Sequence, residues 1–200
     1  GMLVAIATCT PPLSGQKVRS LRMTMARNNK AFDELQRAEQ RTLFVGIESQ
    51  AGYTVSNAHM TVIQTAEERK RMFSAQPSGE GSTVTYPILL SDWTAGCLYI
   101  TTNRENFFSA DHLNLLQDYT NLLALAFEPS AFYPLSDIKL GVMPPYKNQL
   151  PVLRTFQQRV NSKIVDAMRE QRPLNRIDAE NDVWQELEEE LLQLALHSKI

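Results

Sequence analysis

The sequence predicts an α+β fold, in which an antiparallel hairpin is followed by an amphipathic helix and later by two more helices. In residues 83–90 apolar and polar side chains alternate, and a second apolar run follows at residues 96–100 after a short turn at residues 91–94. Two such runs around a turn are typical of a hairpin whose strands are at least half buried. Gly96 opens the second run, where a missing side chain lets another backbone or a ligand come close.

The helix that follows the hairpin is marked by its start and by its apolar spacing. Ser109 is a favourable N-cap, and Asp111 in the first turn suits the positive end of the helix dipole. Apolar residues then recur at three- and four-residue intervals, which predicts one apolar face of about four turns. These residues are Leu113, Leu116, Tyr119, Leu122, Leu123, Ala126 and Phe127.

The elements before the hairpin are shorter. Residues 2–10 form an apolar segment that fits either a helix or a strand. The alternation in residues 21–25 predicts a strand, and residues 43–45 predict another. Helix-forming residues predict a short helix at 32–40, and residues 66–71 form a charged helical turn or loop.

The composition changes after Phe127. Residues 128–151 contain five prolines, which predicts an extended connection. Two amphipathic helices follow. In the first, Leu153, Phe156, Val160, Ile164 and Met168 line one face; in the second, which starts near Asp178, Trp184, Leu187, Leu191 and Leu194 form a short heptad seam. The acidic residues late in the second helix are expected to face solvent or a basic partner. The predicted organisation is therefore a domain at 1–128, a connection at 129–151 and a helical extension at 152–200.

The composition sets limits on function. Apolar residues make up 43% of the chain, enough for a substantial core, and the net charge of -2 argues against direct nucleic-acid binding. The longest apolar runs are far shorter than the roughly twenty residues of a membrane span, so no membrane partner is expected. Cys9 and Cys97 form no disulfide framework, which favours the reducing cytoplasm. The three histidines lack metal-ligand spacing, and neither a metal nor a cofactor is expected.

The order of these motifs resembles the GAF domain family. Residues 45–55 (Val-Gly-Ile-Glu-Ser-Gln-Ala-Gly-Tyr-Thr-Val) look like the glycine-rich segment of that family, and residues 60–64 look like the strand that follows it. The hairpin, with its Ala95-Gly96 pair, and the Phe108-Ser109 helix start then come in the family's order. The resemblance implies a central antiparallel sheet of about five or six strands with helices on both faces, followed here by a C-terminal two-helix extension. It also implies that residues 2–10 are the end of a first helix.

The resemblance to GAF domains also implies a small-molecule pocket over the sheet. The resemblance implies a pocket lined by side chains of the Leu21–Met25 strand, the Glu48–Tyr53 segment and the hairpin. The seven candidate ligand-binding residues are Met23, Met25, Glu48, Tyr53, Tyr86, Ile88 and Tyr99. Tyrosines offer both an apolar ring and a hydroxyl, the usual mixture in such sites, although they serve equally well as core filling.

More specialised GAF chemistry is disfavoured by particular residues. At the position of the family's cyclic-nucleotide motif this chain has Arg104 and a His after Asp111, so an Arg104–Asp111 ion pair that ties the strand end to the helix start is expected instead. Free-methionine sulfoxide reductases of this family use several cysteines. Here Cys97 stands alone in the domain, because Cys9 is expected to precede the core. No catalytic residues are therefore assigned.

The leading hypothesis is a non-catalytic, cytoplasmic sensory or regulatory domain of a bacterial signalling or transcription-control protein. An unknown small-molecule effector would change helix packing and so act on a homodimer or on an attached or upstream output domain. The alternative hypothesis is a ligand-free homodimerisation module that presents the C-terminal helices. An enzymatic function is disfavoured because no paired catalytic groups are present.

Overall fold

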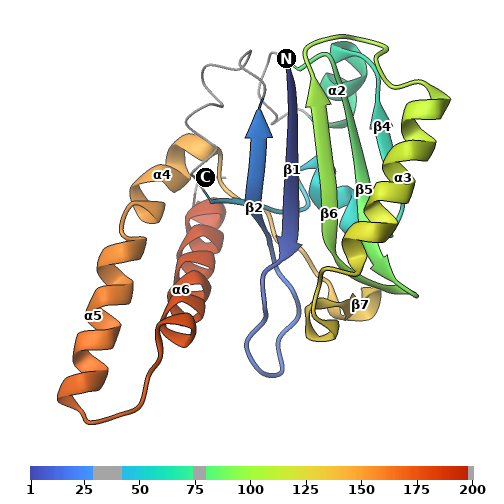
Figure 1. Ribbon diagram of the computed structural model, residues 1–200. Coiled ribbons are helices and arrows are strands. Elements are labelled where there is room, and N and C mark those ends of the chain that lie inside the picture. Colours follow the sequence, from blue (N-terminus) through green and yellow to red (C-terminus); the bar gives the residue numbers. More distant parts are fainter. Residues whose placement is uncertain (29–41, 74–79, 198–200) are drawn as a thin grey trace. The chain divides into compact units, whose positions relative to one another are not determined.

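The chain folds into two units, residues 1–142 and residues 143–200. The computed structural model describes residues 1–28, 42–73 and 80–197, with the side chains of residues 24–28 left aside. The predicted helix at 32–40 lies outside the described residues. The first unit contains the sheet, and the second contains helices (Figure 1).

The first unit is built on a seven-stranded antiparallel sheet in which six strands follow the order β3-β2-β1-β6-β5-β4 and the short β7 pairs with β6. The predicted central antiparallel sheet is thus confirmed. Residues 2–10 are not the end of a helix: they form β1, which lies between β2 and β6, and its side chains alternate in burial as a strand requires. The strands are β1 (Met2–Cys9), β2 (Leu21–Asn28), β3 (Leu43–Val45), β4 (Thr61–Ile63), β5 (Ser82–Leu90), β6 (Trp93–Thr102) and β7 (Tyr133–Pro134).

The predicted hairpin is the pair β5–β6. Its register runs from Ser82 opposite Thr102 to Leu90 opposite Trp93. Residues 93 and 94, which were expected in the turn, are therefore part of the second strand. Gly96 has a φ of 147°, and a Cβ added there would lie 2.0 Å from the carbonyl oxygen of Ala7 on β1. The glycine therefore permits the close approach of another backbone, as predicted.

Helices cover both faces of the sheet. On one face, α1 (Gln50–Asn57) packs through Ala51 and Val55 against a cluster that includes Cys97 and Tyr99; α2 (Ala66–Met72) follows β4. On the other face, α3 (Ala110–Ala124) packs against Val84, Tyr86, Leu98 and Ile100. The predicted arrangement of a sheet between helices is confirmed (Figure 1).

Helix α3 starts as predicted, but its buried face is narrower. The Ser109 side chain accepts a hydrogen bond from the backbone N–H of His112, and the His112 side chain completes a capping box. Leu113, Leu116 and Leu123 pack on the sheet. Tyr119 and Leu122, which were expected on the same face, are 58% and 62% exposed. The prediction was wrong for these two residues because their angular positions on the helix are turned away from the sheet.

The boundary between the units lies after residue 142, not after residue 128. Residues 129–142 belong to the sheet unit because β7 pairs with β6, Ile138 bridges to Val18, and the Gly141 carbonyl accepts from Ile47 N–H. Two short 3-10 helices, Pro129–Ala131 and Leu135–Asp137, flank β7. The proline-rich segment is therefore held on the sheet unit by backbone hydrogen bonds.

The second unit contains α4 (Tyr146–Leu153), α5 (Phe156–Arg169) and α6 (Arg176–His197). Val160, Leu187 and Leu191 are fully buried, and the rings of Phe156 and Trp184 stack at 3.9 Å. Met168 was expected on the buried face but is 72% exposed. No described helix is long and apolar enough to cross a membrane.

Basic residues of α5 meet acidic residues of α6. Lys163 lies 2.8 Å from Glu186 and 3.5 Å from Asp182, and Arg159 lies 2.7 Å from Glu190. The order of these pairs makes α5 and α6 antiparallel. The basic surface that the acids of α6 face is therefore the neighbouring helix of the same unit.

Candidate functional site

A buried polar layer lies on the α1 face of the sheet. Thr83 pairs with Thr101, and Thr85 pairs with Tyr99, so all four side chains project to this one face. The three threonines are fully buried and Tyr99 is 7% exposed. Valine or isoleucine would suit such strand positions without a hydroxyl to satisfy, so each buried threonine hydroxyl requires a hydrogen-bond partner.

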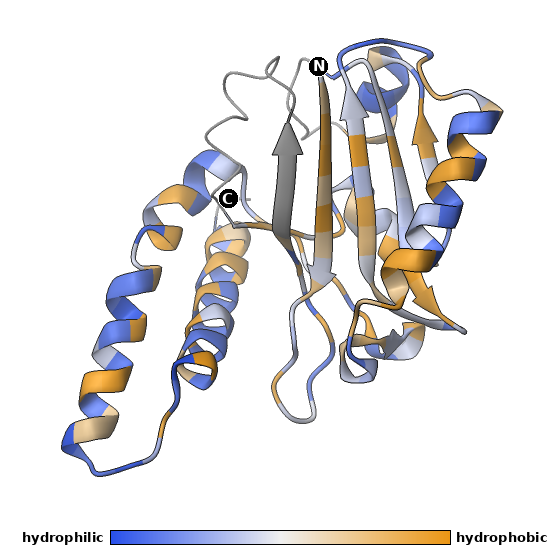
Figure 2. Cartoon of the chain, viewed as in Figure 1, coloured by the Kyte–Doolittle hydropathy of each residue, from blue (hydrophilic) through white to orange (hydrophobic). Residues whose placement is uncertain are grey.

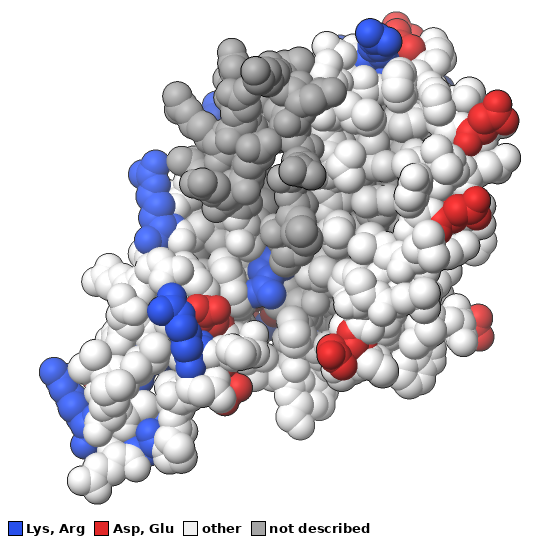
Figure 3. Space-filling view, in the orientation of Figure 1, with Lys and Arg blue, Asp and Glu red and all other residues white. Residues whose placement is uncertain are grey.

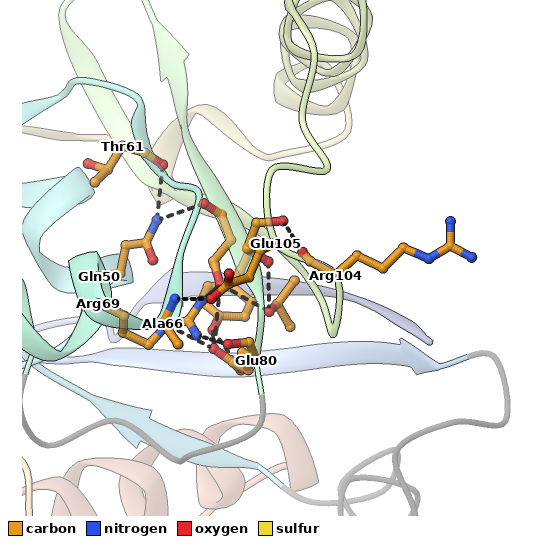
Figure 4. Close-up of polar contacts among 11 residues, drawn as sticks. Gln50, Thr61, Ala66, Arg69, Glu80, Arg104 and Glu105 are labelled. Carbon is orange, nitrogen blue, oxygen red and sulfur yellow. Dashed lines mark hydrogen bonds and ion pairs between the residues drawn. The ribbon is translucent and has the colours of Figure 1, made fainter.

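A charged pair closes one end of this layer. Arg69 on α2 is 4% exposed, and Glu80, which precedes β5, is 8% exposed. The Arg69 Nε atom lies 3.4 Å from Glu80 Oε2 but makes no hydrogen bond to a described residue, so the attraction there is Coulombic rather than directed. The two Nη atoms donate to the Glu80 carbonyl and to Thr83 Oγ1 (Figure 4). Arg69 therefore fastens α2 to the start of β5.

Hydroxyl groups surround the Glu80 carboxylate. The Tyr99 hydroxyl lies 3.1 Å from both carboxylate oxygens and donates to them, while Thr83 Oγ1 lies 3.4 Å from Oε2 and 3.0 Å from Thr101 Oγ1. Burial raises the pKa of Glu80, and this effect exceeds the opposing effects of Arg69 and the hydroxyls. Burial, and then the nearby Glu80 charge, raise the pKa of Tyr99 well above 10, so the phenol stays a neutral donor.

Gln50 of α1 contributes a buried acceptor that lacks a partner. Its Nε2 atom lies 3.0 Å from the Thr61 carbonyl and 3.4 Å from the Thr83 carbonyl, which fixes the orientation of the amide. Its Oε1 atom has no hydrogen-bond partner within the described part of the chain, although the side chain is fully buried. An unsatisfied buried acceptor costs about 1–3 kcal/mol. Nearby, Thr54 Oγ1 bonds to the hydroxyls of Thr61 and Thr85.

The structure does not bring the seven predicted site residues together. Tyr99 and Met23 belong to the cluster on the α1 face. Tyr86 and Ile88 lie on the α3 face, where Tyr86 donates its hydroxyl to the Leu113 carbonyl. Their grouping with Tyr99 was wrong because Tyr86 and Ile88 occupy strand positions of opposite parity to Thr85, the residue that pairs with Tyr99.

The other three candidates lie elsewhere. Glu48 is partly buried and accepts a hydrogen bond from the Gly46 backbone at 2.8 Å, which is a structural role within its loop. Tyr53 is 43% exposed and meets Phe73 edge to face. The side chain of Met25 is outside the described part. Whether any of the seven binds a ligand stays a prediction.

Sequence reasoning missed Gln50, Arg69 and Glu80. Arg69 stands in the run Glu-Glu-Arg-Lys-Arg, where nothing distinguishes it from its solvent-exposed neighbours. Glu80 stands in a loop-like Gly-Glu-Gly sequence. The one usable signal was the alternation of threonines at Thr83 and Thr85 in an otherwise apolar strand, which indicates a polar sheet face.

Both cysteines lie in the same core cluster, so Cys9 does not precede the core as expected. Burial raises the pKa of Cys9 to about 12 and raises the pKa of Cys97 still further, with the neighbouring Cys9 adding to the effect. Such thiols are protonated at neutral pH and are poor nucleophiles. Within the described ranges, no group of three or more potential metal ligands occurs.

The expected Arg104–Asp111 ion pair is not formed. Arg104 extends away from the polar contacts in Figure 4, and its backbone carbonyl accepts from the Ser82 hydroxyl instead. The strand end and α2 are joined by Glu105, whose carboxylate accepts from Ala66 N–H at 2.9 Å. The N–H of Ala66, in the first turn of α2, is one of the donors that a helix leaves without an intrahelical partner, and Glu105 satisfies it.

No family model and no curated protein matches the chain. Among solved structures, it is similar to a type II free methionine-R-sulfoxide reductase from Thermoplasma acidophilum, with 12% identity and a TM-score of 0.46 over 64% of this chain and 77% of that one. It is also similar to the GAF domain from Acinetobacter phosphoenolpyruvate-protein phosphotransferase (14% identity, TM-score 0.46, 61% and 68% covered). A third is the GAF-B domain of DevS from Mycobacterium smegmatis (13% identity, TM-score 0.43, 62% and 77% covered). Residues 1–142 combine an antiparallel sheet with helices on both of its faces, which is the α+β arrangement that the sequence predicted.

Proposed function

We propose that residues 1–142 form a sensory or regulatory domain that binds a small-molecule effector on the α1 face of the sheet, beside Gln50 and the Arg69–Glu80 pair. The observation that carries the proposal is the unpaired Oε1 atom of the fully buried Gln50. Burying an unpaired acceptor within a polar layer lowers stability, and a binding site is a physical reason to keep it. An effector with an N–H or O–H donor would satisfy this oxygen.

The same contacts supply a mechanism for signal transmission. Gln50 belongs to α1 and bonds to the carbonyls of Thr61 on β4 and Thr83 on β5, while Arg69 links α2 to Thr83. An effector that binds more tightly to one arrangement of α1 and α2 on the sheet shifts the population toward that arrangement. A non-catalytic role in bacterial signalling or transcription control, in the cytoplasm, is part of this proposal. The protonated buried thiols support only its non-catalytic part, because they are poor nucleophiles.

Thermal shift with a metabolite panel tests the proposal on the full chain. We expect a specific compound to raise the melting temperature of the wild type by mass action and to lose this effect in Gln50→Leu. Gln149→Leu is the matched control, because Gln149 is also buried, at 1% exposed, but belongs to the helical unit. The proposal fails if no compound shifts the wild type, or if the shift persists in Gln50→Leu.

Homodimerisation through the C-terminal helices is the second candidate. Met168, Ile177 and Leu196 are 72%, 71% and 63% exposed, an unusual amount of apolar surface for a small helical unit. Light scattering on the wild type and on Met168→Glu tests it. A dimer that the substitution dissociates supports the candidate, and a wild-type monomer at all concentrations removes it.

A further inference from the structure

The outer side of α3 carries an exposed stripe that neither the fold nor the proposed effector site uses. The stripe consists of Asp111, Leu115, Asp118, Leu122 and Leu125, whose steps of four, three, four and three residues place them on one side of the helix. The three leucines are 52%, 62% and 77% exposed, and Tyr119, at 58%, borders them. Figure 2 shows that hydrophobic and hydrophilic residues are interspersed along α3.

This stripe is in addition to the face that holds α3 in place. Leu113, Leu116 and Leu123 already pack against the sheet. A helix on the surface of a domain typically has one apolar face, which packs on the core, and a polar face toward water. The second apolar face of α3 is exposed to water and is not stabilised by packing within the domain. Contiguous exposed apolar side chains of this kind mark interaction sites.

The charge around the stripe identifies what it can bind. Asp111 and Asp118 form no ion pair with another residue of the described ranges, and the sequence has no Lys or Arg between Arg104 and Lys139. In Figure 3 the right-hand edge, where α3 lies in Figure 1, carries acidic side chains. The two aspartates are seven residues apart, which is about 10.5 Å along the helix.

We propose that this stripe docks an amphipathic helix of a partner protein, with apolar residues along one side and Lys or Arg residues seven positions apart on the same side. Apolar contacts with Leu115, Leu122 and Leu125 supply the buried area, and the paired cations meet Asp111 and Asp118. Opposite charges at these two positions set the register of the partner helix and exclude partners without them.

The observations favour this partner over others. A second copy of α3 would place carboxylates against carboxylates or against leucines, and buried unpaired carboxylates are costly. Nucleic acid and anionic membranes carry the same sign of charge as the stripe and are repelled by it. The inference concerns α3 alone and does not depend on effector binding on the opposite face of the sheet.

A pair of designed peptides tests the proposal on residues 1–200. Both are fluorescent 21-residue helices with leucines at three- and four-residue spacing; one carries lysines seven positions apart, and the other carries glutamates there. Binding is measured by fluorescence anisotropy for the wild type, for Asp111→Lys/Asp118→Lys and for Leu122→Ser. The control Glu67→Lys/Asp92→Lys makes the same change in net charge at exposed positions outside α3.

We expect the wild type and the control to prefer the lysine peptide, with the charge-reversed stripe variant binding it about tenfold more weakly and preferring the glutamate peptide. Leu122→Ser should weaken binding of the lysine peptide by a similar factor. Circular dichroism checks that each variant is folded. If the control and the stripe variant lost equal affinity for the lysine peptide, the effect would come from net charge alone and the proposal would be overturned. A wild type that binds both peptides equally well would also overturn it. A wild-type dimer that Leu122→Ser dissociates in sedimentation would also overturn it, because the occupant would then be a second copy.

Discussion

Replacing Arg69 by methionine removes the positive charge that faces Glu80 and keeps most of the length of the side chain. The variant loses the 3.4 Å ion pair and the donors to the Glu80 carbonyl and to Thr83 Oγ1. Because both charges of the pair are more than nine-tenths buried, Glu80 is left as an uncompensated buried carboxylate. We expect the free energy of unfolding of residues 1–142 to fall by about 3–5 kcal/mol at pH 7.

The second variant, Glu80→Gln, and the double variant isolate the charge. Glutamine keeps an acceptor for the Tyr99 hydroxyl, and the Glu80 backbone carbonyl still accepts from Arg69. The double variant, Arg69→Met with Glu80→Gln, has no carboxylate at position 80 and therefore no buried charge without a partner. We therefore expect the double variant to be more stable than Arg69→Met, although it carries one more substitution.

The dependence on pH has a definite sign. The pKa of Glu80 is raised in the folded state, mainly by burial, so the folded protein holds this proton more firmly than the unfolded chain does. The resulting destabilisation is fully present above the folded-state pKa and disappears as the pH falls below the unfolded value of 4.5. Removing Arg69 takes away a group that lowers this pKa, so Arg69→Met should lose more stability at pH 8 than at pH 5.5.

Urea unfolding is followed by tryptophan fluorescence in a Trp184→Phe background, where Trp93 of β6 reports on the sheet unit and a phenyl ring replaces the indole that stacks on Phe156. The urea midpoint and slope give the free energy of unfolding for each variant at both pH values. A loss below about 1 kcal/mol for Arg69→Met at pH 7 would refute the reasoning, since that is the scale of an exposed pair. So would a double variant whose loss equals the sum of the single losses.

Three further predictions concern other parts of the sheet unit. Gly96→Ala should lower the free energy of unfolding in urea by about 3 kcal/mol or more, because a Cβ would meet the Ala7 carbonyl oxygen and an L-residue is strained at this positive φ. A decrease below about 1 kcal/mol would mean that β1 can move away. Ser109→Ala should lower the unfolding free energy by about 1 kcal/mol through loss of the α3 cap, whereas Ser109→Asp, measured beside it, should retain most of the stability. Cys9 and Cys97 should resist a chromogenic disulfide reagent in the native protein and react fully in denaturant, because both are buried with raised pKa values; rapid native labelling of either thiol would contradict this.

Local patterns were sufficient for much of the fold. The alternation around Tyr86, the glycine at position 96 and the cap at Ser109 each depend on residues close together in the sequence, and the structure has the predicted hairpin and helix there. The same patterns left the segment at 2–10 open between helix and strand. Its central place in the sheet comes from pairing with β2 and β6, and the β6 partner lies about ninety residues away.

The sequence by itself determined the α+β class, the main antiparallel hairpin and the amphipathic character of the later helices, since periodicity and capping are local properties of the chain. The tertiary structure alone decided which sheet face each tyrosine joins and which of three adjacent basic residues in α2 is buried against Glu80. It also decided that Leu122 is exposed and that Gln50 is buried. The physical reason is that the free energy of a polar or apolar side chain depends on what the rest of the fold places beside it, and those neighbours are distant in sequence.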